Sequence, residues 1–427
     1  MRFKTLPEWL QWQEQLHFTN VDPGLTRIGQ VWQLLGRESV LPFTVVTVAG
    51  TNGKGSSVAM LSSILCEAGY RVGTYTSPHL LEYNERICIN TIPCDDELIC
   101  QSFERIDRAR DTISLTYFEF STLAAVDIFC QQNIDIAILE VGMGGRLDAT
   151  NLFDCDIALI TPIGLDHTAW LGTDIEQIGR EKAGIIRSEK PVVCSQPVPP
   201  KSVINYAKKC QSPISLAGRD FNFDMGTNDW RWHNKTSNRE QLALPALVGS
   251  YQIQNASAVL QVIDLLISEY NYSLSNQQIS SGLKHTKLAG RFQQIDGDIK
   301  QIFDVTHNEQ GAQNLAKLLQ EIPCKGRTVA VLAMLNDKDP VTVVDELKDV
   351  IDDWYVAGLE GNRGMAAETL ATLLKESIPS LQVIQKERVV DAYQAALNNA
   401  IKGDRVLILG SFLTVEAVLK FLNLEIK

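Results

Sequence analysis

The feature that most constrains the fold is the segment VVTVAGTNGKGSS, residues 45–57. Its β-branched residues favour a strand, and they pass directly into glycines with Lys54 among them. Apolar residues then recur with helical spacing from Val58 to Leu65. A strand, a glycine-rich turn and a helix in this order are typical of a phosphate-binding loop, because glycine lets the backbone approach the ligand closely. The strict GxxxxGK[ST] pattern is not met, since Val48 stands at its first glycine, so an ordinary turn with a solvated lysine remains the alternative.

Short apolar runs alternate with helical patterns in the first two thirds of the chain. Strands are expected at residues 71–77, 135–142, 156–163 and 191–196, and helices at 117–132 and 250–270. Such alternation indicates a mostly parallel sheet covered by helices on both faces. Residues 197–245 are more polar, and we expect hairpins or a surface insertion there.

The alternation restarts near residue 300, after a polar, glycine-containing stretch that is typical of a domain junction. Further strands are expected at 302–307, 327–335, 354–359 and 405–411, with helices between them. This second unit has no glycine-rich phosphate turn of its own. The sequence therefore predicts an α/β protein of two domains, an ATP-binding domain over residues 1–296 and a smaller domain over 297–427.

Charge and hydropathy limit the partners. The formal net charge of -12 argues against nucleic acid, which requires a basic face. No apolar run approaches the roughly 20 residues that a membrane span needs, and the N-terminal residues lack the apolar core of a signal peptide. We therefore expect a cytoplasmic protein, a monomer that acts on small molecules without nucleic acid or membrane.

Polar residues follow three of the expected strands. Ser77, Glu140 and His167 come after strands whose carboxyl ends meet at one edge of a parallel sheet, where ligands bind. These side chains are candidate Mg²⁺ ligands, although each could instead serve as a cap, an ion-pair partner or a hydrogen-bonded histidine. By composition alone, Lys182 belongs to a solvated charged face. His307, which closes the first strand of the second unit, could face a ligand between the domains or form a turn.

Together these segments resemble one family, the Mur ligase superfamily, and within it the folylpolyglutamate synthases. The segments GTNGKG, SPHL, NERI, TYFEF, EVGMGGRLDATN, LDHTAWLG, REKAGI, GRFQ and DVTHN have that family's order and spacing, from about residue 16 to residue 415. The resemblance implies a Mur-ligase-like P-loop domain with a mostly parallel sheet, followed by a smaller Rossmann-like C-terminal α/β domain.

The resemblance also implies an activity. It implies a ligase that uses ATP and Mg²⁺ to join L-glutamate to dihydropteroate, forming dihydrofolate, and to reduced folates, through an acyl phosphate. A folylpolyglutamate synthase with that activity alone and a nucleotide-binding protein without ligase activity are the alternatives. A peptidoglycan-type Mur ligase fits less well, because only 44 residues precede Val45 where those enzymes have a further domain.

The family match assigns roles residue by residue. The implied ATP contacts are Thr51, Asn52, Gly53, Lys54, Gly55, Ser56, Asn255, Arg291 and Asp304. The implied metal ligands are Ser77, Glu140, His167 and a carbamylated Lys182, and the catalytic residues are Lys54, His167 and Lys182. The implied substrate contacts are Asp22, Pro23, Gly24, Thr116, Tyr117, Phe118, Glu119, Leu147, Asp148 and Ala149. Two departures from the family pattern concern His307, which is followed by Asn308 and Glu309 in place of Asn-Pro, and the proline at position 23.

Overall fold

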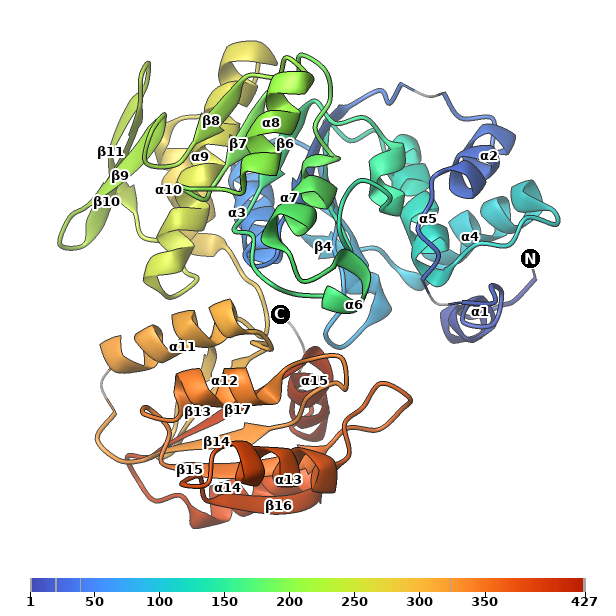
Figure 1. The fold of residues 1–427 in the computed structure, drawn as a ribbon. Coiled ribbons are helices and arrows are strands. Elements are labelled where there is room, and N and C mark those ends of the chain that lie inside the picture. Colours follow the sequence, from blue (N-terminus) through green and yellow to red (C-terminus); the bar gives the residue numbers. More distant parts are fainter. Residues whose placement is uncertain (1, 20, 39, 323, 425–427) are drawn as a thin grey trace.

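Two α/β lobes make up the chain in the computed structural model, which describes residues 2–19, 21–38, 40–322 and 324–424 (Figure 1). The larger lobe holds an eight-stranded sheet in the order β4-β3-β2-β5-β1-β6-β7-β8. The pairs from β2 to β8 are parallel, and β3 and β4 add an antiparallel edge. The strands are β1 (Thr44–Ala49), β2 (Val72–Tyr75), β3 (Ile87–Ile89), β4 (Ile92–Pro93), β5 (Ile136–Glu140), β6 (Ile157–Ile160), β7 (Val192–Cys194) and β8 (Ile214–Leu216).

Helices cover both faces of this sheet, as the continuous apolar runs of its strands require. Alternate residues of β1 serve the two faces: Val45 and Ala49 pack on one, Val46 and Val48 on the other. The first face is covered by α1 (Leu6–Gln13), α2 (Thr26–Leu34), α4 (Asp96–Arg110), α5 (Tyr117–Gln131), α7 (Ile175–Ala183) and α8 (Lys201–Lys209). The second is covered by α3 (Lys54–Glu67), α9 (Ser250–Glu269) and α10 (Asn276–His285).

The expected hairpins occur as a separate antiparallel sheet, formed by β9 (Phe221–Met225), β10 (Asp229–Asn234) and β11 (Asn238–Ala243). Trp230 and Trp232 of β10 are buried against the second face, and the indole of Trp232 donates to the carbonyl of Ser257 in α9 at 3.0 Å. Only the later part of the polar stretch 197–245, which holds β9, β10 and β11, is therefore an insertion into the larger lobe. The first residues of the stretch form α8, whose apolar residues Val203 and Ala207 are buried, and β8, which belongs to the main sheet.

The smaller lobe holds a six-stranded sheet in the order β12-β13-β17-β14-β15-β16, parallel except for β12. Its strands are β12 (Gln293–Ile295), β13 (Lys300–Asp304), β14 (Thr328–Leu332), β15 (Asp353–Gly358), β16 (Val383–Arg388) and β17 (Arg405–Leu409). One face carries α11 (Glu309–Glu321), α12 (Pro340–Leu347) and α13 (Ala367–Ser377), and the other α14 (Val389–Asn399) and α15 (Phe412–Phe421). The division at residue 296 stays a prediction; β12, which precedes it, pairs within the smaller lobe's sheet.

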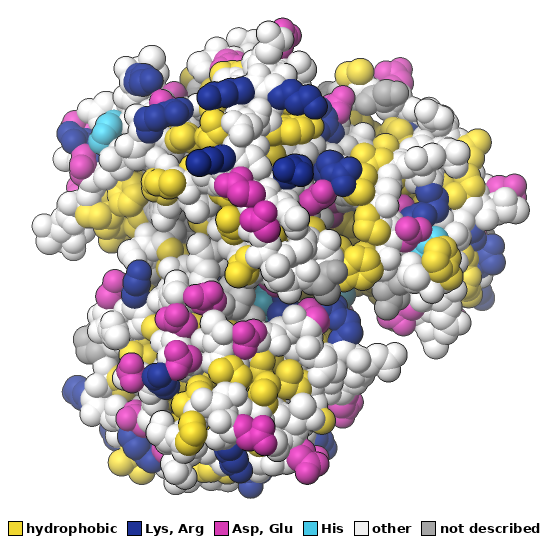
Figure 2. All heavy atoms as spheres, in the orientation of Figure 1, with side chains coloured by type: hydrophobic (Ala, Val, Ile, Leu, Met, Phe, Trp, Pro, Cys, Tyr) yellow, Lys and Arg dark blue, Asp and Glu magenta, His cyan; other side chains and the backbone are white. Residues whose placement is uncertain are grey.

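The lobes face each other across a hollow, which Figure 2 shows between the upper and lower parts of the molecule. The net charge is not evenly spread on this face. Lysine and arginine side chains gather over α8, and acidic side chains gather over α11 and α12. In the part of the chain that the structure describes, no helix combines the length and the apolar character that crossing a bilayer requires.

Candidate active site

The loop between β1 and α3 has the backbone of a phosphate-binding turn. Gly50 and Gly53 have φ angles of 155° and 87°, and Gly53 caps the N-terminus of α3. A Cβ atom on Gly50 would lie 1.8 Å from the Thr161 hydroxyl, and one on Gly53 would lie 2.7 Å from the Asn255 side-chain oxygen. Both positions therefore require glycine. The contact at Gly53 also brings Asn255 of α9 to the loop, as the family resemblance implies.

Two lysines meet at the carbonyl oxygen of Gly50. Lys54 donates to it at 3.2 Å and to the carbonyl of Thr51 at 3.3 Å, while Lys182 of α7 donates to it at 2.8 Å. Burial and the nearby charge of Lys54 lower the pKa of Lys182 to about 7, against the attraction of Asp166 and Asp148. Lys182 is therefore not on a solvated face, and near neutral pH part of its population is an uncharged amine.

Glu140 is a buried carboxylate with little compensation from the protein. It ends β5, is 5% exposed, and accepts a hydrogen bond from the backbone N–H of Ser77 at 3.3 Å. Burial raises its pKa, although the charge of Lys54 opposes this shift. A buried carboxylate with so few partners is costly unless a cation joins it. This observation fits a divalent cation bound between Glu140 and the loop.

The other predicted metal ligands lie around the same loop. Among the described residues, no three carboxylate, imidazole or thiol groups stand close enough to form a metal centre by themselves. Mg²⁺ tolerates this, because it keeps several waters and needs only one or two protein carboxylates. Burial, which outweighs the attraction of Asp166, lowers the pKa of His167 to about 4, so its imidazole is neutral. Within the described residues, no hydrogen bond or ion pair joins His167 to Glu140 or Ser77.

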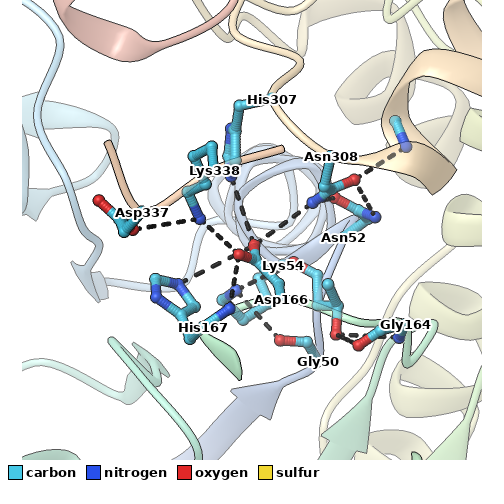
Figure 3. Close-up of polar contacts among 12 residues, drawn as sticks. Gly50, Asn52, Lys54, Gly164, Asp166, His167, His307, Asn308, Asp337 and Lys338 are labelled. Carbon is cyan, nitrogen blue, oxygen red and sulfur yellow. Dashed lines mark hydrogen bonds and ion pairs between the residues drawn. The ribbon is translucent and has the colours of Figure 1, made fainter. Parts of the chain in front are cut away.

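Asp166 is the centre of a network between the lobes that the sequence did not identify (Figure 3). Its carboxylate pairs with the ammonium of Lys338, which lies in the loop before α12, and with the His307 ring at 3.4 Å. It also accepts from the side chain of Asn308 at 3.3 Å. Although burial alone raises its pKa, the bond to His307 and the charges of His307, His167 and Lys338 hold that pKa well below its usual range. Two loops of the smaller lobe, one with His307 and Asn308 and the other with Lys338, thus converge on one carboxylate beside the phosphate loop.

A second set of polar contacts joins the lobes at the loop itself. The side-chain amide of Asn52 donates to Asn308 at 3.1 Å and to Gln310 at 2.8 Å, and accepts from Asn308 at 3.2 Å. Asn308 also caps α11 by accepting from the Gly311 backbone at 2.9 Å. The chain after His307 is therefore well ordered by hydrogen bonds despite the missing proline.

Other predicted nucleotide contacts fall at the same place. Thr51 donates from its hydroxyl to the carbonyl of Gly164 at 3.0 Å, and Ser56 is buried and accepts from the Gln252 side chain at 3.2 Å. A Cβ atom on Gly55 would lie 3.9 Å from the Glu140 carboxylate. These residues surround the start of α3, whose positive dipole end favours an anion.

Arg291 and Asp304 lie where the chain enters the smaller lobe. The Arg291 guanidinium lies over the ring of Phe412, 5.2 Å from its centre. The buried carboxylate of Asp304 accepts from the backbone of Phe292 at 2.8 Å and from the backbone and hydroxyl of Thr306 at 2.9 and 2.6 Å. Asp304 therefore already holds this junction together, whatever further contact it makes to a nucleotide.

Two of the predicted substrate segments are tied together by Arg27, a residue that belongs to none of the motifs named above. Its guanidinium pairs with Asp22 and donates to both carboxylate oxygens of Glu119, at 3.2 and 2.9 Å. Glu119 in turn accepts from the backbone of Thr116 at 2.8 Å in a capping box that starts α5. His17 contacts Asp22 from the other side at 3.1 Å. The loop of residues 22–24, which includes Pro23, is thus anchored to the start of α5.

The remaining substrate residues lead back to the phosphate loop. The ring of Phe118 packs so closely on Gly142 that a Cβ there would lie 2.6 Å from it. Asp148 starts the short helix η2 (Ala149–Leu152) and accepts from the backbone of Met143 at 2.9 Å. Gly142 and Met143 line one cavity together with residues of the phosphate loop, of the segments that follow β5 and β6, and of α7, namely Gly50, Thr51, Lys54, Val141, Gly144, Asp166, His167 and Lys182. The structure therefore brings the phosphate, metal and substrate segments to one site.

Comparisons with known proteins agree with this geometry. Residues 48–263 match the sequence model of the Mur ligase middle domain, and residues 290–412 match that of the Mur ligase glutamate ligase domain. The dihydrofolate synthase/folylpolyglutamate synthase of Escherichia coli is 42% identical over 98% of this chain and 96% of its own length. The chain spans nearly the whole of that relative.

Solved structures give the same result. The structure of E. coli FolC in complex with DHPP and ADP has a TM-score of 0.91 at 41% identity and covers 98% of both chains. A bifunctional folylpolyglutamate synthase/dihydrofolate synthase with Mn, AMPPNP and L-glutamate bound has a TM-score of 0.89 at 39% identity, over 99% of this chain and 98% of that one. The chain therefore belongs to the dihydrofolate synthase/folylpolyglutamate synthase family of Mur ligases, and it is an ATP-dependent ligase.

Proposed function

We propose that this chain joins L-glutamate to dihydropteroate, forming dihydrofolate, and to reduced folates, forming polyglutamates. The observation that carries the proposal is the packing of Phe118 on Gly142, which places the predicted acceptor segment beside the cavity that Lys54 and Lys182 line. The names of the relatives support the same substrates. The cytoplasmic location, the monomeric state and the lack of a nucleic-acid partner remain predictions from the sequence.

The proposed reaction has two steps. A carboxylate oxygen of the acceptor attacks the γ-phosphorus of ATP, the bond from that phosphorus to the bridging oxygen breaks, and ADP leaves. The amine nitrogen of glutamate then attacks the acyl carbon, and inorganic phosphate leaves as the amide forms and the nitrogen loses its extra proton to solvent. Closing the lobes over the cavity keeps water away from the acyl phosphate, which water would hydrolyse.

The roles of the side chains follow from charge. Lys54 and the loop amides stabilise the negative charge that spreads over the phosphoryl group in transfer. A Mg²⁺ ion held by Glu140 and Ser77 would neutralise phosphate charge at the same place. Asn255, Arg291 and Asp304 are proposed to contact ATP, and the segments that contain Asp22, Thr116 and Asp148 to hold the pterin end of the acceptor.

We propose that Lys182 carries a carbamate. Carbamate forms when an uncharged amine attacks CO₂, and a pKa of about 7 supplies that amine at neutral pH. The modification replaces one of two crowded cations with an anion, which relieves the repulsion from Lys54 and adds an oxygen ligand beside the phosphate loop. A ¹³C NMR spectrum of protein equilibrated with ¹³CO₂ is expected to contain a carbamate resonance that the Lys182→Met variant lacks.

The proposed activity is tested by phosphate release from ATP with glutamate and each acceptor in turn. Release with both dihydropteroate and tetrahydrofolate is expected. Release with tetrahydrofolate alone would identify a folylpolyglutamate synthase without the first activity. ATP binding without acceptor-dependent release from either would contradict the proposal.

A further inference from the structure

Arg86 is a partly buried cation near the candidate metal site. It ends the short helix η1 (Tyr83–Arg86), which follows the SPHL segment, and leads into β3. Among the described residues, no carboxylate forms an ion pair with it. Its Nε–H donates to the Nδ1 atom of His79 at 2.8 Å, and its guanidinium lies over the rings of Tyr83 and Tyr117, 5.6 and 5.5 Å from their centres.

None of these neighbours neutralises the charge. His79 accepts this hydrogen bond through Nδ1, which therefore carries no proton, so its ring is uncharged. A guanidinium has five N–H donors, and the bond to His79 uses one of them. The tyrosine rings attract the cation through their faces and leave the other donors free for a ligand.

The position of Arg86 relates it to the acceptor. Tyr117 follows Thr116 in the segment proposed to bind the substrate, while His79 lies two residues after Ser77. The charge of Arg86 also contributes to the environment of the Glu140 carboxylate, where it favours the ionised form. Arg86 thus contacts the proposed acceptor segment and lies close enough to Glu140 for its charge to act on that carboxylate, in a protein whose net charge is -12.

We infer that the guanidinium of Arg86 binds a carboxylate of the acceptor. The inference rests on the proposed function and adds a residue that determines which acids the site accepts. A planar guanidinium matches a carboxylate with two parallel hydrogen bonds, which a lysine cannot reproduce. The competing explanation is a purely structural role, in which Arg86 only holds η1 against α5 through the two tyrosine rings.

The test compares binding of dihydropteroate with binding of its analogue in which a phenyl group replaces the benzoate. Wild-type protein, Arg86→Gln and the control Arg388→Gln are titrated with each compound and the dissociation constants are measured. Arg388 is exposed and pairs with Asp391 on the smaller lobe. Arg86→Gln removes both charge-assisted hydrogen bonds, and it is expected to weaken dihydropteroate binding at least about 10- to 100-fold and to leave the analogue's binding unchanged. The control is expected to change neither.

Equal weakening of both compounds, or of neither, would overturn the inference and leave a structural role. If Arg86→Gln fails to fold, Arg86→Lys is titrated in the same way. Lysine keeps the charge but lacks the two parallel N–H donors of the guanidinium, so a smaller rise in the dissociation constant, for dihydropteroate alone, is expected. Tetrahydrofolate extends the test, because its benzoyl carbon is an amide and its carboxylates are those of the terminal glutamate. Weaker binding of dihydropteroate alone identifies the benzoate as the bound group, while weaker binding of both acceptors shows that Arg86 binds the carboxylate of either one.

The controls separate this inference from the proposed function. Wild-type protein without acceptor-dependent phosphate release would overturn the proposed function, and the inference with it. Normal wild-type release, combined with unchanged dihydropteroate binding by Arg86→Gln, would overturn the inference alone.

Discussion

The ammonium groups of Lys54 and Lys182 donate to the same carbonyl oxygen, that of Gly50, at 3.2 and 2.8 Å. Two like charges that share one acceptor in a buried site repel each other strongly. Burial and this repulsion bring the pKa of Lys182 to about 7. Near neutral pH, part of the Lys182 population therefore gives up its proton.

Replacing Lys182 with methionine is expected to stabilise the protein at low pH in CO₂-free buffer. Lys182 has a pKa of about 7 in the folded protein and 10.5 in the unfolded chain. Between these pH values the lysine is therefore protonated in the unfolded chain and mostly uncharged in the folded protein. The penalty of the buried charge is therefore complete below pH 7 and disappears as the pH rises towards 10.5. Urea denaturation is expected to give a gain of about 2–4 kcal/mol at pH 6 and almost none at pH 10. The exposed Lys209 replaced by methionine serves as control, and a gain independent of pH would contradict the argument.

Lys54→Ala is expected to lower kcat by about 100- to 1000-fold, because the loop loses the charge that stabilises the transferred phosphoryl group. Within the described residues, its ammonium donates hydrogen bonds only to carbonyl oxygens of its own loop, so the fold is expected to persist. Phosphate release measures the first effect, and thermal unfolding the second. A variant that kept normal turnover would show that the loop does not serve phosphoryl transfer.

Gly53→Ala is expected to weaken ATP binding at least about 10-fold. A methyl group there meets both a φ of 87° and the Asn255 side chain at 2.7 Å. Gly36→Ala is the matched control, since Gly36 has a φ of 69° but no atom within 4 Å of its Cβ position. The control is expected to lose about 1 kcal/mol of stability from backbone strain and to bind ATP normally. Equal effects on ATP binding would show that strain, rather than the contact with α9, matters.

The ion pair of Asp166 with Lys338 is expected to hold the lobes together. Lys338→Met leaves a buried carboxylate short of a partner and is expected to cost about 3–5 kcal/mol of stability. The double variant with Asp166→Asn is expected to lose less than the sum of the single variants. Because the pKa of Asp166 is lowered, its contribution is present above the unfolded value of 3.8 and is lost only as the pH falls further. Denaturation curves at pH 5 and at pH 8 are therefore expected to give the same coupling free energy between Asp166 and Lys338. If the losses of the two single variants simply add in the double variant, the interaction is contradicted.

Arg27→Met is expected to raise the KM for dihydropteroate by about 10-fold or more while the KM for ATP stays unchanged. Without Arg27, Asp22 is no longer tied to Glu119, and the loop of residues 22–24 loses its anchor on α5. Steady-state kinetics with each substrate varied in turn measures the difference. A parallel rise in both KM values would indicate a general disturbance of the fold instead.

The parts of the fold that were predictable are those with strong local signals. The helix expected at 117–132 is α5 (Tyr117–Gln131), which begins at a Thr116/Glu119 capping box, and the helix expected at 250–270 is α9 (Ser250–Glu269). The elements that were missed, such as β16 and the β3–β4 edge, are short or exposed and depend on their sheets. Predicted strands also extended beyond the true ends, because loops at the site continue the apolar character of the strands.

The site divides in the same way. Lys54 and Glu140 follow strands of one parallel sheet, whose carboxyl ends lie at the same edge, so their proximity was predictable. Lys182 was assigned to the site by the family resemblance alone, because a charged residue on a helix gives no sign of its burial. Nothing in the sequence was a reason to select Lys338, Arg27 or Asp166. The Lys338–Asp166 and Arg27–Glu119 pairs join residues more than 90 positions apart, and only the Arg27–Asp22 pair is local. A charged residue in a polar loop gives no sign of such a partner until the lobes are in place.

Leu80 belongs to the larger lobe's chain, yet it packs in the apolar cluster of the smaller lobe, beside Val305 and Val415. It also lies against Gly290, where a Cβ would be 3.4 Å from its side chain. Leu80 stands three residues after Ser77, so a rotation of the smaller lobe pulls on the backbone that presents Ser77 to Glu140. A cation held by Ser77 and Glu140 at the proposed site would therefore be coupled to the interlobe angle: an angle that brings Ser77 to Glu140 would strengthen its binding, and the bound cation would favour that angle in turn.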